Sequence, residues 1–150
     1  MSNRDAVTAL ILEVFQLNGR LLAAGDGLVQ DLGLTSARWQ VLGAVAMSPV
    51  PVPVAHIARN MGLSRQGVQR LVNELEGQGI VRLAPNPHHQ RARLVLLTER
   101  GQALYRAASA RQTPWAEALA QGLPAEEIAA ATSLLRRLRG RLAAAEGDDA

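Results

Sequence analysis

The stretch Val54–Leu83, VAHIARNMGLSRQGVQRLVNELEGQGIVRL, decides the fold of this chain. The spacing of its apolar residues predicts a short helix over 54–61 and a second helix over 65–76. A Gly-Leu-Ser turn separates the two, and Ser64 occupies the position of an N-cap for the second helix. Two helices joined by such a short turn are typical of a helix-turn-helix.

Two strand-like runs, 80–83 and 94–97, follow the second helix. The loop between them, 85–93, contains two prolines and an asparagine, which break strands and favour a hairpin loop. In a winged helix-turn-helix, one helix enters the major groove while a β-hairpin wing reaches along the DNA backbone. We therefore expect a mainly α-helical chain with a small antiparallel β-hairpin wing, and sequence-dependent DNA binding.

The second helix divides into an apolar face and a polar face. Its apolar residues recur three and four positions apart, as on a buried helix face: Val68, Leu71, Val72 and Leu75. The polar residues that then point outward carry amide or guanidinium groups: Arg65, Gln66, Gln69, Arg70 and Asn73. Arginine pairs with guanine, and glutamine or asparagine with adenine, so these residues and Ser64 are the predicted DNA contacts of the helix. The alternative is a solvated polar face, but the flanking turn and hairpin favour DNA reading.

The loop of the predicted wing adds four candidate DNA contacts. Arg91 and Arg93 suit phosphate or minor-groove binding. His88 and His89 are interpreted as exposed hydrogen-bonding residues near phosphate. The two histidines could also bind a metal, but they lack the cysteines and nearby carboxylates of a metal site, so none is predicted.

The charge distribution agrees with DNA binding. The chain has 150 residues, one domain-sized unit, and a net charge of only +3. Residues 54–106, however, hold eight arginines against three glutamates, which leaves +5 where DNA would lie. Because the chain has no cysteine, thiol-based sensors and Cys-ligated metal centres are excluded. No phosphate-binding loop, nucleophile elbow or metal-ligand cluster is present, so neither an enzyme nor a cofactor is expected.

Outside this segment the sequence predicts helices. An apolar stripe runs through the first helix, and three glycines, Gly25, Gly27 and Gly33, are expected to loosen the chain before the next one. Thr35 or Ser36 would cap that next helix. The run PVPVP at 49–53 cannot be helical, so it is either an extended connection or a short edge strand beside the hairpin.

The C-terminal part predicts two further helices. Thr98 would cap a long helix in which Pro114 either produces a kink, the preferred alternative, or starts a new helix. Pro124 marks the start of the last helix, whose apolar residues recur three and four apart as in a helix–helix seam. A helix packed inside a monomer could show the same pattern, but we favour dimerisation through the terminal helices.

The chain is expected to be cytoplasmic. Its N-terminus lacks the pattern of a signal peptide, and no window approaches about 18 uninterrupted apolar residues, so no membrane partner is predicted.

The order and spacing of several elements resemble the MarR family of bacterial transcription regulators. The resemblance rests on the run LTSARWQVL at 34–42, the helix-turn-helix, Asn86-Pro87 in the wing, and LTERG at 97–101. It implies a homodimer in which 1–34 and 99–150 form a helical dimerisation region around a DNA-binding region at 35–98, all within one intertwined domain. Such a dimer would bind a pseudo-palindromic operator in double-stranded DNA, most simply as a repressor.

The family also implies release from DNA by a small aromatic or phenolic compound. Its ligand pocket would lie between the first helix, the helix of Trp39 and the long helix after Thr98, so Arg38 and Trp39 are candidate pocket residues. Trp39 is as well suited to the core. The alternative function is a DNA-binding or architectural dimer that responds to no ligand.

The wing departs from the family pattern at one position. Family wings carry an aspartate followed closely by an arginine, a pair that braces the loop. Here Arg91 is present, but His89 stands where the aspartate would fall. The wing is therefore either looser than usual or held by a different partner.

Overall fold

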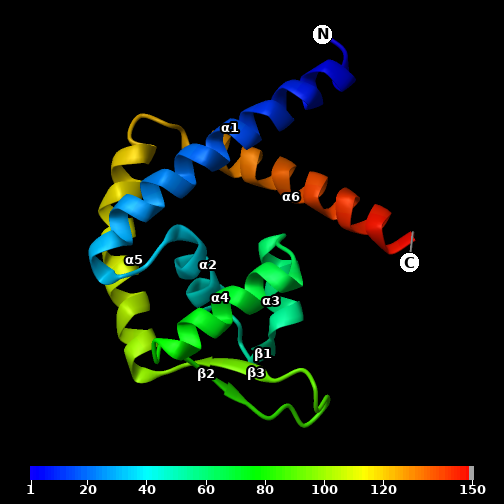
Figure 1. Cartoon of the computed structure of the whole chain (residues 1–150). Helices are drawn as coiled ribbons and strands as arrows, with labels where there is room; N and C mark the ends of the chain where they lie inside the picture. The colour runs from blue at the N-terminus through cyan, green and yellow to red at the C-terminus, as the bar shows by residue number, and fades with distance from the viewer. Residues whose placement is uncertain (149–150) are drawn as a thin grey trace. The chain divides into compact units, whose positions relative to one another are not determined.

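The computed structural model describes residues 1–148 and divides into two compact units, Met1–Thr113 and a second unit from Pro114 onward. Along the chain the elements are α1 (Asn3–Val29), the 3-10 turn η1 (Gln30–Leu32), α2 (Ser36–Ala46), β1 (Val52–Pro53), α3 (Val54–Met61), α4 (Arg65–Gly77), β2 (Val81–Ala84), β3 (Leu94–Leu97), α5 (Glu99–Ala120) and α6 (Ala125–Asp148) (Figure 1). This confirms a mainly helical winged helix-turn-helix. The predicted division by role, 35–98 against the terminal regions, stays a prediction, and its last two residues lie outside the described ones.

The three strands form one small antiparallel sheet in the order β1-β3-β2. Val81 of β2 lies opposite Leu97 of β3, which confirms the predicted hairpin. On the other side of β3, Val52 pairs with Val95, so the proline-rich run ends in a short edge strand. Proline is tolerated there because an edge position does not require its missing N–H.

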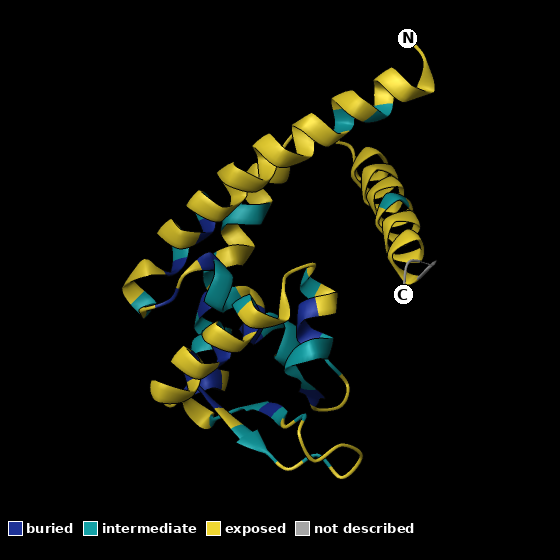
Figure 2. Cartoon of the chain, turned by 45° about the vertical axis from the view of Figure 1, so that its right-hand side comes forward, coloured by how far each residue is buried: buried dark blue, intermediate teal, exposed yellow. Residues whose placement is uncertain are grey.

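The core of the first unit lies where α2, α3 and α4 meet the sheet (Figure 2). Its fully buried side chains come from each of these elements: Val41 and Leu42 of α2, Ile57 of α3, Val68, Val72 and Leu75 of α4, Val81 of β2 and Val95 of β3. The predicted apolar face of α4 is therefore confirmed, with Leu71 only half-buried at its edge. Because three side chains on one face of α4 are held in this core, its rotation about its own axis is fixed.

A polar junction joins α1 to the first turn of α2. The buried Ser36 donates its backbone N–H to Asp26 Oδ1 at 2.7 Å and its hydroxyl to the Leu22 carbonyl at 2.7 Å. Thr35 is the N-cap, since its hydroxyl accepts from the backbone N–H of Arg38 at 3.2 Å. Of the two predicted caps, therefore, Thr35 begins the helix and Ser36 anchors it to α1.

The expectation that glycines loosen this region was wrong for Gly25 and Gly27. Both lie inside α1, which continues to Val29, and only Gly33 adopts a left-handed φ, of 75°. Gly25 is buried, and a Cβ built on it would collide with the hydroxyl of Ser36. Glycine is present there because the two helices approach closely at this point.

A second tie links the end of α1 to α5. Arg111 donates to the Leu28 carbonyl at 3.1 Å and forms an ion pair with Asp31 in η1. The hydrogen bond from Arg111 holds the pKa of the Asp31 carboxyl below its usual value. The C-terminal end of α1 is thus attached to both neighbouring helices of the first unit.

The long helix α5 begins at its predicted cap and continues as one helix past Pro114. The Thr98 hydroxyl accepts from the backbone N–H of Gly101 at 3.1 Å, which confirms the predicted cap. The helix runs through Pro114, so the alternative of a new helix starting there was wrong. The last helix, α6, begins directly after Pro124, as predicted.

The helix α1 carries more apolar side chains than are buried in the core of the first unit. By length and composition alone, the segment Asn3–Leu32 is long and apolar enough to cross a membrane, a property that we did not anticipate. Large apolar side chains on its first half remain exposed, among them Ile11 at 44%, Phe15 at 69% and Leu17 at 55%. These side chains are available for a further packing partner.

The junction at Gly25 can be tested against Gly27 in the same helix. Gly25→Ala should lower the free energy of unfolding by about 1–3 kcal/mol, because the added methyl group displaces Ser36. A Cβ at Gly27 meets nothing within 4 Å. Gly27→Ala should therefore raise stability by about 0.5–1 kcal/mol through helix propensity. Urea unfolding would measure both variants, and a similar gain in each would contradict the proposed close packing.

Candidate nucleic-acid interface

The turn between α3 and α4 is fixed by local backbone chemistry. Gly62 ends α3 with a left-handed φ of 67°, a conformation that glycine adopts without a steric penalty. Ser64 then caps α4, because its hydroxyl accepts from the backbone N–H of Gly67 at 3.1 Å. The predicted N-cap is confirmed, and the start of α4 is set within a few residues of the end of α3.

The outward side of α4 carries the predicted polar residues. All of them are exposed: Arg65, Gln66, Gln69, Arg70 and Asn73. Gln69 donates its side-chain amide to Asn73 Oδ1 at 2.8 Å, one turn further along the helix. This contact orients the two amides and leaves the Gln69 oxygen and the Asn73 amide nitrogen able to meet base edges.

These side chains and the wing line one surface groove of about 630 Å³. Its walls hold all the predicted polar residues of α4 except the capping Ser64, together with Arg91 and Arg93 from the wing. Apolar residues that include Val54 and Leu83 also line it. The groove therefore brings four guanidinium groups and three amide side chains together on one side of the winged unit.

Asn86 holds the loop of the wing. Its side-chain amide donates to the Ala92 carbonyl at 2.9 Å, and its Oδ1 accepts from the backbone N–H of His88 at 3.0 Å. The backbone adds bonds from His89 N–H to the Asn86 carbonyl at 3.2 Å and from Ala92 N–H to the His89 carbonyl at 3.2 Å. The wing is thus held by a partner other than the family's aspartate. The tendency of asparagine to form such local bonds is the signal that could have identified it.

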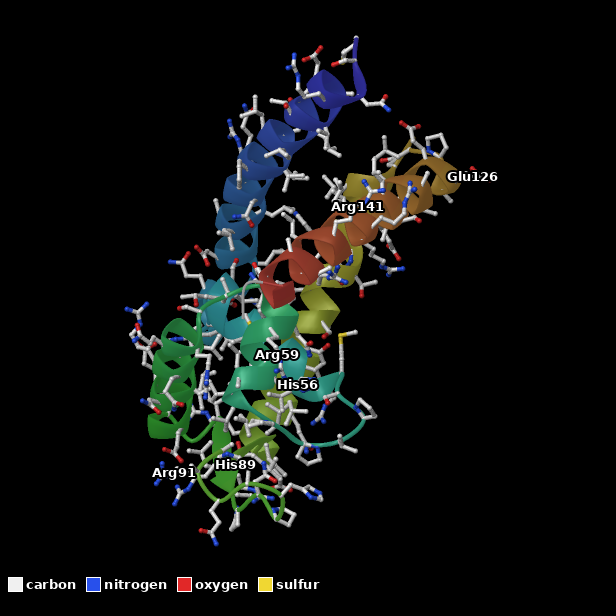
Figure 3. The ribbon with its side chains drawn as sticks, turned by 90° about the vertical axis from the view of Figure 1, so that its right-hand side faces the viewer. His56, Arg59, His89, Arg91, Glu126 and Arg141 are labelled. Carbon is white, nitrogen blue, oxygen red and sulfur yellow. The ribbon has the colours of Figure 1, made fainter. Side chains whose placement is uncertain are left out.

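The remaining predicted wing residues are exposed. Figure 3 labels His89 and Arg91 in the wing loop and shows His56 and Arg59 on α3. His88 and His89 are both exposed, but neither is among the residues that line the groove. They are close in sequence to Arg91, which does line it. Within residues 1–148, no three histidine, aspartate or glutamate side chains gather in a group that could hold a metal ion.

The two residues proposed for a ligand pocket lie in the first turn and a half of α2. Trp39 is partly buried against the core. The Arg38 guanidinium binds Glu74 of α4, with Nη2 and Oε2 3.0 Å apart. Sequence inspection missed this ion pair, because its members are 36 positions apart. The pocket itself stays a prediction.

Comparisons with known proteins agree with this geometry. The sequence model of the MarR family matches residues 32–92, which include α2, the helix-turn-helix and most of the wing. An uncharacterised protein of Mycobacterium tuberculosis, Rv2011c, is 36% identical over 134 residues, which cover 89% of this chain and 92% of that protein. The transcriptional activatory protein BadR of Rhodopseudomonas palustris is 32% identical over 100 residues, or 65% of this chain and 57% of BadR.

Solved structures show the same fold. CouR from Rhodococcus jostii RHA1, crystallised with p-coumaroyl-CoA, has a TM-score of 0.78 and 25% sequence identity, over 87% of this chain and 91% of CouR. The element order, the winged sheet and the family match lead to one conclusion: this chain belongs to the MarR family of transcription regulators.

Proposed function

We propose that this protein is a transcriptional repressor that binds a pseudo-palindromic operator as a homodimer. The observation that carries the proposal is the groove in which the polar side of α4 and both wing arginines meet. A surface with several guanidinium and amide groups suits the edges of base pairs and the phosphates beside them. Family membership supports the regulatory role.

The two parts of the groove would contribute differently. The exposed residues of α4, foremost Gln66 and Arg70, would read bases in the major groove. Arg91 and Arg93 would bind phosphate or the minor groove, and the exposed His88 and His89 would lie near phosphate. Most of the affinity would come from the backbone contacts, and the base preference from α4.

The homodimer is supported by apolar faces on the terminal helices. On α1, Val14, Leu17 and Leu21 are exposed at 37–55% along the face that continues from its buried end. In the second unit, α6 exposes apolar residues such as Ile128 at 42% and Leu142 at 68%. A second copy of the chain is the proposed cover for these faces, since long apolar helix faces associate in water. In such a dimer the two α4 helices would lie roughly 34 Å apart, in successive major grooves.

The direction of regulation and the effector are also proposals. CouR was solved with p-coumaroyl-CoA, a thioester whose acyl group is aromatic, which supports a compound with an aromatic group as the signal that releases this protein from DNA. BadR is named an activatory protein, so activation is the second candidate. A promoter–reporter assay separates repression from activation, and titration of aromatic acids against the DNA complex separates release by ligand from a ligand-independent dimer. The proposed location is the cytoplasm, where the DNA is.

The assigned roles of α4 and the wing predict different mutational signatures. On a duplex selected from a random pool by the wild-type protein, Gln66→Ala or Arg70→Ala should cost about 1–3 kcal/mol of binding free energy and relax base preference. Arg91→Ala should weaken selected and scrambled duplexes alike and reduce the salt slope by about one. Fluorescence anisotropy at several salt concentrations measures these effects. Equal losses on both duplexes for Gln66→Ala would contradict base reading by α4.

The role of Asn86 in the wing can be tested by comparing it with a control substitution at a neighbouring residue of the loop. Asn86→Ala should weaken binding to every duplex, because the loop that presents Arg91 loses two side-chain hydrogen bonds. Gln90→Ala, an exposed residue of the same loop, should change binding by no more than about 0.5 kcal/mol. The loss in the double variant Asn86→Ala/Arg91→Ala should be smaller than the sum of the single losses. Additive losses would show that Asn86 does not act through Arg91.

The dimer is tested on α1 with one added charge on either side of the helix. Val14→Glu should raise the dimer dissociation constant at least about tenfold, because it buries an unpaired carboxylate in the interface. Gln16→Glu adds the same charge about 200° around the helix and should leave the dimer intact. Sedimentation velocity gives the oligomeric state. A wild-type protein that is monomeric at all concentrations, or equal effects of both variants, would refute this interface.

A further inference from the structure

An acidic residue, Glu74, lies next to the polar side of α4, although it is not among the residues that line the groove. Glu74 is 42% exposed and follows Arg70 by four residues, so the two side chains stand one turn apart on the helix. A carboxylate at that spacing attracts the arginine along the helix surface and repels phosphate. Left alone, Glu74 would therefore compete with DNA for Arg70.

Arg38 of α2 forms an ion pair with this carboxylate. Its Nη2 lies 3.0 Å from Glu74 Oε2, and its side chain is only 22% exposed. By contrast, Arg70 has no ion-pair partner among residues 1–148 and remains exposed in the groove. The arrangement leaves one arginine paired and the other available.

The first turn of α2 holds the backbone of Arg38 in a fixed position. Thr35 caps its backbone N–H, and Ser36 is bound to the Leu22 carbonyl and to Asp26 of α1. The side chain of Arg38 therefore begins from a turn that is anchored on one side to α1 and reaches α4 on the other. Arg38 therefore adds a polar link between α2 and the recognition helix to the apolar packing of these two helices.

We infer that Arg38 is a positioning residue for DNA recognition, which withdraws Glu74 from the DNA surface and so keeps Arg70 available for a base or phosphate. The inference rests on the proposed function, in which α4 reads DNA. It gives Arg38 a role different from the contact with an effector that the family resemblance implied.

The energetics separate this role from a purely structural one. An ion pair with partly exposed members contributes little to stability. Loss of the pair should therefore leave the fold nearly unchanged. Capture of Arg70 by the freed Glu74 carboxylate can weaken DNA binding only as far as that exposed pair competes with DNA, so we expect a loss of about two- to sixfold on a selected duplex.

The test compares Arg38→Gln, Glu74→Gln and the double variant with the wild-type protein on the selected duplex. Arg38→Gln should weaken binding about two- to sixfold. Glu74→Gln should stay within about 1.5-fold of wild type, since an exposed pair contributes little by itself. The double variant should return to within about 1.5-fold of Glu74→Gln, because no carboxylate remains to capture Arg70. Melting temperatures should differ little among the four proteins.

Each other outcome overturns the inference. A double variant as weak as Arg38→Gln would mean that Arg38 contacts DNA itself. Wild-type affinity in Arg38→Gln would mean that the pair has no influence on binding. If Arg38→Gln weakens binding equally in an Arg70→Ala background, the effect does not pass through Arg70. Failure of the wild-type protein to select any duplex would overturn the proposed function, a result distinct from the three above, and this inference with it.

Discussion

The burial of one face of α4 is the constraint on which the rest of the interface depends. Val68, Val72 and Leu75 are fully buried against α2, α3 and the sheet, so the helix cannot rotate without exposing them to water. With that rotation fixed, the opposite side carries its amides and guanidinium groups outward in a defined order. The wing, held by Asn86, then completes the groove. Which side chains α4 presents outward is thus determined by apolar packing on the opposite side of the same helix.

Polar contacts connect this helix to the rest of the first unit. Arg111 ties α5 to the end of α1, and Ser36 ties α1 to α2. Arg38 then joins α2 to Glu74 on α4. These contacts connect α1, the helix whose exposed face is the proposed dimer contact, to the recognition helix through α2.

Short-range sequence patterns predicted most of the fold. The features that sequence inspection missed depend on contacts between residues that are far apart in the chain. The two faces of α4, the caps at Ser64 and Thr98 and the hairpin follow from spacings of a few residues, and all are present. Gly25 was misread, because glycine permits both loose chain and close helix contact, and only the neighbour decides between them. The Arg38–Glu74 pair could not be predicted, since its members become adjacent only through the packing of α2 on α4. Whether the groove residues bind DNA remains a prediction.

The most direct test of the central claim removes acceptors from the major groove alone. In a duplex selected by the wild-type protein, each purine is replaced in turn by its 7-deaza analogue, which lacks the N7 that arginine, glutamine and asparagine bind. The account predicts that substitutions weaken binding in two clusters about one helical turn apart, one for each α4 of the dimer. Binding that is unaffected by every 7-deaza substitution would contradict it.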